Sequence, residues 1–162
     1  MRGTLTLLNK WDARWLEIAG VVSTWSKDPS TKIGAIAVKD KRLVSTGYNG
    51  FPRGIQDYDD RWNNREEKYK YVVHAEMNCI YNANYHNQSL KGSTMYIVGL
   101  PVCHECAKGI IQAGVVRVVA EFLDAPLKWA KSTEITTKMF KEAGIVYDKF
   151  YRRRIKEIKT YI

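Results

Sequence analysis

Two short motifs contain residue types that bind metal ions. "HAE" places His74 and Glu76 two residues apart, and "CHEC" places Cys103 and Cys106 three residues apart. Residues i and i+3 share one face of a helix, so both thiols can point at a single ion. One imidazole and two thiolates leave the fourth tetrahedral position open for water, which is the arrangement of catalytic rather than structural zinc. The spacing therefore predicts a catalytic zinc site.

Glu76 is the residue that would transfer protons at this site. Zinc lowers the pKa of a bound water from 15.7 to about 7. A carboxylate that does not bind the metal can take that proton and return it to a leaving group. H-x-E followed by P-C-x-x-C is the pattern of zinc-dependent nucleobase deaminases, in which the glutamate is the general acid and base. The two motifs together therefore predict hydrolytic deamination.

The second motif departs from that pattern by one residue. Val102 stands between Pro101 and Cys103, whereas the proline of the pattern directly precedes the first cysteine. The spacing between the two cysteines is unchanged, so we expect the metal site to form. Val102, unlike proline, has a backbone N–H that needs a partner. The departure therefore raises a question about the local geometry of this turn.

Other interpretations of these residues stay open. Cys103 and Cys106 could form a redox pair. His104 could be the fourth ligand of a structural zinc, although it adjoins Cys103 and would reach the same ion only with strain. We expect the third cysteine, Cys79, to be a small core residue, and His86 to lie at the surface near a helix end. An odd, low number of cysteines argues against a disulfide framework.

The two motifs begin helices that alternate with strands. Apolar residues at helical spacing predict a first helix over 9–26 that buries one face, formed by Trp11, Trp15, Ile18, Ala19 and Val22. Further helices are predicted over 63–71, 74–86, 103–114 (closed by Gly114) and 131–144, strands over 32–40, 43–48, 93–100, 115–122 and 145–150, and a loop over 49–60. This order predicts a three-layer α/β/α fold whose mixed central sheet has about five strands.

Length and composition suit one soluble domain. The chain has 162 residues, 45% of them hydrophobic, which is enough for a core. No apolar run approaches the roughly 20 residues that cross a bilayer, and the first residues lack a secretory signal. We therefore expect a cytoplasmic protein with no membrane partner. The net charge of +9 would attract the phosphates of a nucleotide or a nucleic acid. Part of this charge lies in the tail over 148–162, which is either a solvated helix face or a contact surface for phosphates or other subunits.

Beyond the two motifs, the sequence resembles the deoxycytidylate (dCMP) deaminase family, within the wider cytidine deaminase superfamily. The resemblance covers roughly residues 9–148. It rests on "DPSTKIGAIAV", "LVSTGYNGFPRGI", "HAEMN", "GSTMYIVGLPVCHECAKGIIQAGV" and "FKEAGI". "GYNGFPRG" is the segment that narrows the superfamily to this family. The resemblance implies a deaminase domain over 9–148 followed by a basic C-terminal extension over 149–162.

The resemblance also implies roles for individual residues. The zinc ligands and Glu76 would act as predicted above. Asn49 would contact the deoxyribose, although in an N-G pair its ordinary role is to form a turn. Ala75 would lend its backbone N–H to the pyrimidine carbonyl. The segment "SKDPSTK" would face the 5′-phosphate, unless its lysines are simply solvated, and its candidate contacts are Lys27, Ser30, Thr31 and Lys32.

The implied reaction is hydrolysis of dCMP to dUMP and ammonia, which supplies dUMP for dTMP synthesis. Members of the family are typically oligomers, often hexamers, activated by dCTP and inhibited by dTTP, and Mg²⁺ would accompany these triphosphates. The effector site is implied for Gly47, Tyr48, Asn49 and Gly50, and Arg53 is a further candidate for phosphate binding. Some members hold a second, structural zinc with extra cysteines and histidines. Because Cys79 is the only spare cysteine here, we expect one zinc per subunit.

Two other functions stay open. A deaminase of tRNA or single-stranded nucleic acid would use the positive charge to follow an extended backbone. "GYNGFPRG" disfavours this function, so nucleic acid is not the expected partner. A non-catalytic, nucleotide-binding regulatory subunit would leave Glu76 idle, and a glutamate beside a three-ligand zinc argues against that.

Overall fold

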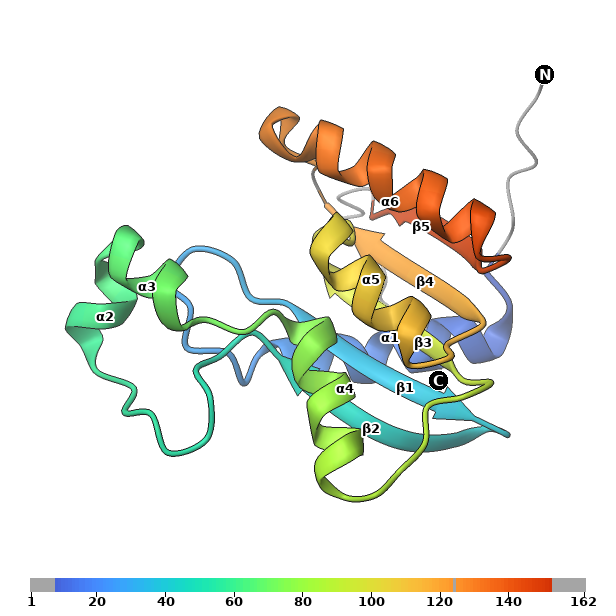
Figure 1. Cartoon of the computed structure of the whole chain (residues 1–162), viewed down its shortest axis with the longest axis horizontal. Helices are drawn as coiled ribbons and strands as arrows, with labels where there is room; N and C mark the ends of the chain where they lie inside the picture. The colour runs from blue at the N-terminus through green and yellow to red at the C-terminus, as the bar shows by residue number, and fades with distance from the viewer. Residues whose placement is uncertain (1–7, 124, 153–162) are drawn as a thin grey trace, which may run out of the picture.

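A five-stranded mixed sheet forms the centre of the molecule, with the strand order β2-β1-β3-β4-β5. The computed structural model describes residues 8–123 and 125–152 (Figure 1). The strands are β1 (Gly34–Lys39), β2 (Arg42–Tyr48), β3 (Thr94–Gly99), β4 (Arg117–Phe122) and β5 (Val146–Tyr151). The helices are α1 (Lys10–Ser23), α2 (Asp59–Asn63), α3 (Arg65–Tyr71), α4 (Ala75–Tyr85), α5 (His104–Gln112) and α6 (Ala130–Glu142), with a 3₁₀ turn, η1 (Leu127–Trp129), before α6.

The pairing of the strands confirms the predicted mixed sheet. β1 and β2 form an antiparallel hairpin whose turn residues, Asp40 and Lys41, both have positive φ, as a two-residue turn of this type requires. β1 also pairs antiparallel with β3, whereas β3, β4 and β5 run parallel. Because β3 and β4 are parallel, the chain that leaves β3 enters α5 at the carboxyl edge of the parallel strands.

Helices cover both faces of the sheet, which confirms the predicted three layers. α1 packs against β1 and β3 on one face, and α4, α5 and α6 lie on the other (Figure 1). Successive residues of a strand point to opposite faces. Accordingly, Ala35 and Ala37 of β1 belong to the core beneath α4 to α6, and Ile36 and Val38 to the core beneath α1.

The buried face of α1 differs from the predicted one. Ala19 and Val22 are buried as expected, but Trp15 and Ile18 are only half-buried and Trp11 is 41% exposed. The positions that complete the buried face are Asp12 and Leu16. Asp12 accepts two hydrogen bonds from the guanidinium of Arg117 and one from the hydroxyl of Tyr96. Because its carboxylate is fully paired, α1 can turn a charged residue toward the sheet and leave a tryptophan outside.

Gly47 sets the distance between α4 and the sheet. A Cβ at this position in β2 would lie 2.2 Å from the Cys79 nitrogen and 2.4 Å from the Ala75 carbonyl oxygen. Only glycine therefore lets the first turns of α4 lie directly on β2. Cys79 itself is fully buried, as predicted for a core residue.

The helix predicted over 63–71 forms α3, which begins at Arg65, but a further short helix, α2, begins inside the predicted loop over 49–60. Asn64 separates α2 from α3, and its side chain accepts hydrogen bonds from the backbone N–H groups of Glu66 and Glu67, so it caps α3. The pair extends beyond one end of the sheet (Figure 1). Lys68 of α3 links the two short helices to the loop between α1 and β1, through a buried ion pair with Asp28 that is 3.1 Å in length.

The remaining predictions concern helix ends and the tail. Gly114 has positive φ just after α5, and the exposed His86 ends α4, both as expected. β5 continues to Tyr151, past the predicted boundary at residue 148, and residues 153–162 of the predicted extension lie outside the described residues. Among the helices that the structure describes, none is long and apolar enough to span a membrane.

Candidate active site

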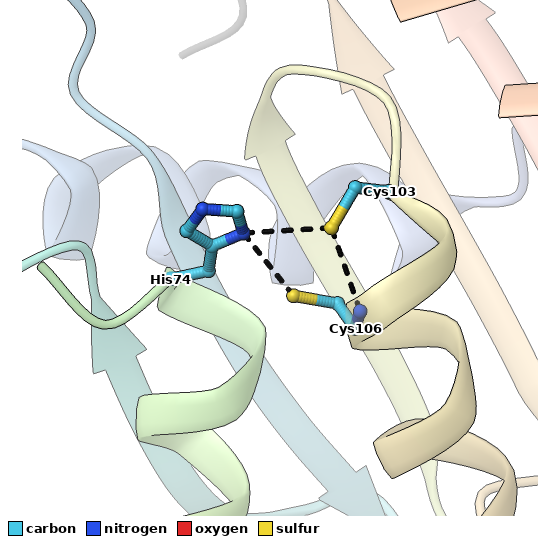
Figure 2. A group of neighbouring side chains, drawn as sticks. All are labelled: His74, Cys103 and Cys106. Atoms are coloured by element: carbon cyan, nitrogen blue, oxygen red, sulfur yellow. Dashed lines mark hydrogen bonds between the residues drawn. The ribbon is translucent and has the colours of Figure 1, made fainter. Parts of the chain in front are cut away.

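The three predicted metal ligands meet where two helices begin. His74 is the N-cap residue of α4, Cys103 is the N-cap residue of α5, and Cys106 lies in the first turn of α5. Nδ1 of His74 lies 3.5 Å from the Cys103 sulfur and 3.4 Å from the Cys106 sulfur. Figure 2 shows the imidazole of His74 facing both sulfur atoms across the gap between the helices. All three ligand atoms lie within 4.8 Å of one another.

This geometry fits a tetrahedral zinc ion. Zn–S bonds of about 2.3 Å and Zn–N bonds of about 2.0 Å at the tetrahedral angle place nitrogen and sulfur ligands about 3.5 Å apart, close to both observed separations. An imidazole with two thiolates is also a donor set that suits zinc. Among the described residues, no other group of three histidine, cysteine or acidic side chains gathers in this way.

His104 is turned to other partners. Its Nδ1 lies 2.8 Å from the Ser132 hydroxyl, and its Nε2 lies 3.2 Å from a carboxylate oxygen of Glu105. Both ring nitrogens are therefore engaged away from the cysteines, which argues against His104 as a fourth ligand.

Charges within the cluster favour metal binding. A hydrogen bond from Cys106 lowers the pKa of the Cys103 thiol to about 4, and the same interaction, together with burial, raises the pKa of Cys106. The backbone N–H of Cys106 also points at the Cys103 sulfur, 3.4 Å away. Cys103 in turn raises the pKa of His74. The site thus stabilises a thiolate, the form of cysteine that binds metals.

Glu76 lies in the same first turn of α4 as the histidine. Its side chain is buried, and burial raises the pKa of its carboxyl group. Glu76, His74 and Cys103 line one cavity of about 240 Å³. A buried carboxyl group beside the metal cluster, in the wall of a cavity, is the arrangement expected of a general acid and base.

The substrate contacts predicted from the sequence divide into two groups. Asn49, Ser30 and Thr31 line the cavity. Lys27 and Lys32 are not part of its lining, because Lys27 pairs with Asp57 at 2.9 Å and Lys32 donates to the Ser26 carbonyl. Ala75 is the first residue of α4, where a backbone N–H has no partner within the helix.

A buried polar network holds the loop that carries Ser30 and Thr31. Asp28 accepts hydrogen bonds from the backbone N–H groups of Ser30 and Thr31 as well as from Lys68. Asn49 donates to the Thr31 carbonyl and accepts from the Ile33 N–H, each at 2.8 Å. Asn49 is thus more than a turn residue, because its amide fixes one wall of the cavity. Its oxygen keeps one lone pair for a further donor.

Several residues of the cavity wall were not predicted from the sequence. Arg65 and Lys128 bring two further cations to it, and Trp62, Tyr69 and Trp129 bring aromatic surface. Arg65 belongs to the polar stretch around α3, which resembles an ordinary solvated helix, and Lys128 precedes α6 without any motif. In the sequence, the aromatic residues near Arg65 and Lys128 were the only signal that could have indicated a binding surface there.

The segment predicted to bind effectors packs beside the N-terminus of α4. Gly50 pairs with Val73 through two backbone hydrogen bonds, and Asn78 of α4 donates to the Tyr48 carbonyl at 2.8 Å. Arg53 is exposed and stacks over the Tyr85 ring, 4.2 Å from its centre. This segment is therefore in direct contact with the helix that presents His74 and Glu76.

Comparison with known proteins places the chain in a family. A family model for the cytidine and deoxycytidylate deaminase zinc-binding region matches residues 9–122, a span that includes both motifs. The chain belongs to this family of zinc-binding deaminases.

The relatives of the chain include deoxycytidylate deaminases. It is 38% identical over 149 residues to deoxycytidylate deaminase of Homo sapiens, a match that covers 87% of this chain and 80% of the human protein. It is 37% identical over 141 residues to an uncharacterized deaminase in the luxG 3′ region of Aliivibrio fischeri, covering 86% and 92% of the two chains. A crystal structure of dCMP deaminase from the cyanophage S-TIM5, in complex with dCMP and dUMP, shares the fold with a TM-score of 0.71 at 24% identity, covering 89% of this chain and 99% of that one.

Proposed function

We propose that the protein catalyses the zinc-dependent hydrolytic deamination of dCMP to dUMP, with release of ammonia. The observation that carries this proposal is that Glu76 is buried in the wall of the same cavity as His74 and Cys103. Its similarity to deoxycytidylate deaminases over most of its length supports dCMP as the substrate. We infer that the reaction belongs to pyrimidine nucleotide metabolism and takes place in the cytoplasm.

His74, Cys103 and Cys106 would hold one zinc ion per chain. When bound, zinc would act as a Lewis acid and make a water molecule nucleophilic at neutral pH. Glu76 would accept one proton from the attacking water and pass it to N3 of the cytosine ring. It would then carry the remaining proton of the new C4 hydroxyl to the amino group, so that the C4–N bond breaks as the C4 carbonyl forms. The products are dUMP and ammonia, and Glu76 regains its starting protonation state.

The other walls of the cavity would orient the nucleotide. The backbone N–H of Ala75 donates to the pyrimidine carbonyl, and the free lone pair of Asn49 accepts from the sugar hydroxyl. The 5′-phosphate would lie against the hydroxyls of Ser30 and Thr31 and the cations of Arg65 and Lys128, which all line the cavity. The cations of Arg65 and Lys128 give a reason for the enzyme to prefer a nucleotide to a nucleoside.

We also propose that the protein forms homo-oligomers, as hexamers, and that dCTP activates and dTTP inhibits it. The effectors, carrying Mg²⁺ on their phosphates, would bind at the segment from Gly47 to Gly50 with Arg53. The contact of this segment with the N-terminus of α4 supports the proposal, because binding there would reach the residues that do the chemistry.

Ammonia release from cytidine, dCMP and dCTP, each with and without dTTP, tests the proposed function. We expect dCMP to be hydrolysed with the highest kcat/KM and dTTP to inhibit that hydrolysis. Equal or faster hydrolysis of cytidine would contradict the assignment of dCMP. Deamination of a single-stranded oligonucleotide, with a salt-sensitive gel shift, would instead favour the nucleic-acid deaminase that the net charge of +9 leaves open.

A further inference from the structure

The turn that carries Cys103 is held by side chains from distant parts of the chain. Val102, the extra residue of the motif, is fully buried. Its backbone N–H donates to the Tyr147 hydroxyl of β5 at 3.3 Å, and its carbonyl accepts from the Thr136 hydroxyl of α6 at 2.9 Å. The backbone N–H and carbonyl of Val102 therefore both have hydrogen-bond partners within the protein. Such partners are needed because water does not reach a buried turn.

α6 also holds the residue on the other side of the cysteine. Ser132 Oγ accepts the backbone N–H of His104 at 3.0 Å. Ser132 and Thr136 are four residues apart and so share one face of α6. Cys103 thus lies between two residues whose backbones are hydrogen-bonded to the same helix face.

The other threonines of α6 behave differently. Thr133 and Thr137 donate to carbonyls of their own helix, at Trp129 and Thr133, which is the common bond of a helical threonine. Thr136 donates to Val102 across the interface instead. This contrast indicates that the Thr136 hydroxyl has a specific partner in the turn.

We propose that Thr136 and Tyr147 are positioning residues for the metal ligand Cys103, and that they compensate for the extra residue between Pro101 and Cys103. Proline directly before the cysteine would present no N–H, whereas Val102 presents one that only Tyr147 satisfies among the described residues. Thr136 fixes the opposite side of the same peptide segment. With the segment held at both groups, the Cys103 sulfur stays at its distance from His74.

This inference rests on the proposed zinc site. Its test is the rate at which a colorimetric chelator removes zinc from the purified protein. Thr136→Val and Tyr147→Phe each remove one hydroxyl with little change in shape. We expect zinc loss to be faster by roughly tenfold in Thr136→Val, in line with the effect of outer-shell partners on metal sites. The effect should be smaller in Tyr147→Phe, whose hydrogen bond is longer. Thr136→Ser, which keeps the hydroxyl, and Thr137→Val, which removes a hydroxyl from the same helix, should behave as the wild type.

A second measurement uses the same variants after their metal has been removed, and follows amide hydrogen exchange in the peptide over 100–106. We expect faster exchange in Thr136→Val and Tyr147→Phe than in the wild type and the controls. This expectation does not depend on zinc binding. Wild-type protein that binds no zinc would count against the proposed site, whereas this exchange pattern would still support the held turn. Unchanged zinc loss and unchanged exchange in both variants would overturn the inference. Zinc loss that is equally fast in Thr137→Val would also overturn it. So would a lower melting temperature of Thr136→Val and Tyr147→Phe without faster zinc loss, because either result would show a general effect on stability.

Discussion

At the scale of single residues, surroundings decide which of two similar side chains is suited to chemistry. Glu76 and Glu105 each follow a metal-site residue by two positions. Glu76 is 4% exposed, and burial raises the pKa of its carboxyl group. The Glu105 side chain is 66% exposed, and a hydrogen bond from Lys108 lowers its pKa. Of the two, only Glu76 has the buried environment, beside the metal cluster, that is expected of a general acid and base.

The cations of the cavity wall lead to a prediction about substrate binding. Arg65→Gln should raise the KM for dCMP about tenfold and leave kcat nearly unchanged, since a contact to the phosphate binds substrate and transition state equally. Steady-state kinetics with dCMP and cytidine measure this, and turnover of cytidine should be unaffected. Lys70→Gln is the control, because Lys70 lies on the same helix but pairs with Glu67. An equal change of KM in both variants would contradict a phosphate contact by Arg65.

Residue types and spacing were enough to predict the metal cluster but not the cavity wall. His74, Cys103 and Cys106 occur at intervals that only a few kinds of site require. Lys27 and Arg65, in contrast, are cations in polar stretches, and the sequence around each is compatible with a solvated side chain. The partner of Lys27, Asp57, is thirty positions away, so its engagement could be recognised only from the structure.

At the scale of elements, the active site depends on how closely α4 approaches the sheet. Gly47 of β2 allows contact with the backbone of α4 at Ala75 and Cys79. The same helix presents His74 at its N-cap. A shift of α4 by the width of a methyl group would therefore move the histidine relative to the cysteines of α5.

Gly47→Ala and Gly20→Ala form a matched pair of substitutions. Overpacking in Gly47→Ala should destabilise the protein by about 2 kcal/mol or more and should reduce its zinc content. Gly20 lies within α1 with no atom within 4 Å of an added Cβ, so Gly20→Ala should stabilise the protein by about 0.5–1 kcal/mol. Urea unfolding and metal analysis check both variants. Equal stability of the two variants would contradict the close approach at Gly47.

The order of elements could be predicted because strands and helices alternate with clear periodicity. The orientation of α1 could not be predicted, since apolar residues at helical spacing occur on more than one adjoining face of this helix. Asp12 is buried only because Arg117 and Tyr96, more than eighty positions later, supply its hydrogen bonds. Likewise, the partners of Val102 lie 34 and 45 positions away. Long-range pairing of this kind has no local signature in the sequence.

At the scale of the whole molecule, one polar network joins the first helix to the last strands. Arg117 of β4 pairs with Asp12 of α1 and with Asp148 of β5, each at 2.8 Å. Burial alone would raise the pKa of Asp12, but the hydrogen bonds from Arg117 and Tyr96 and the charge of Arg117 outweigh it and lower that pKa. The ionised form of Asp12 is thus stabilised by folding, and the network contributes to the stability of the fold as a whole.

This network predicts a pH dependence of stability. A carboxyl whose pKa is lowered by folding contributes fully above its unfolded value of about 3.9, and the contribution is lost as the pH falls through the lower folded value. At pH 7, Asp12→Asn should be less stable than the wild type by about 2 kcal/mol. This loss is smaller than for a fully buried ion pair, because Arg117 is partly exposed and still pairs with Asp148 in the variant. Urea unfolding should show this difference shrinking below about pH 4. A difference that stays constant down to pH 2 would contradict the role of ionised Asp12.

The central claim is that Glu76 carries the protons of a zinc-dependent deamination, and Glu76→Gln tests it most directly. The variant should keep about one zinc per chain and the wild-type unfolding curve, while ammonia release from dCMP falls by about 10³-fold. Glu105→Gln, the same change at an exposed carboxylate in the second motif, should keep full activity. Ammonia release by Glu76→Gln close to that of the wild type, with zinc bound, would contradict the mechanism.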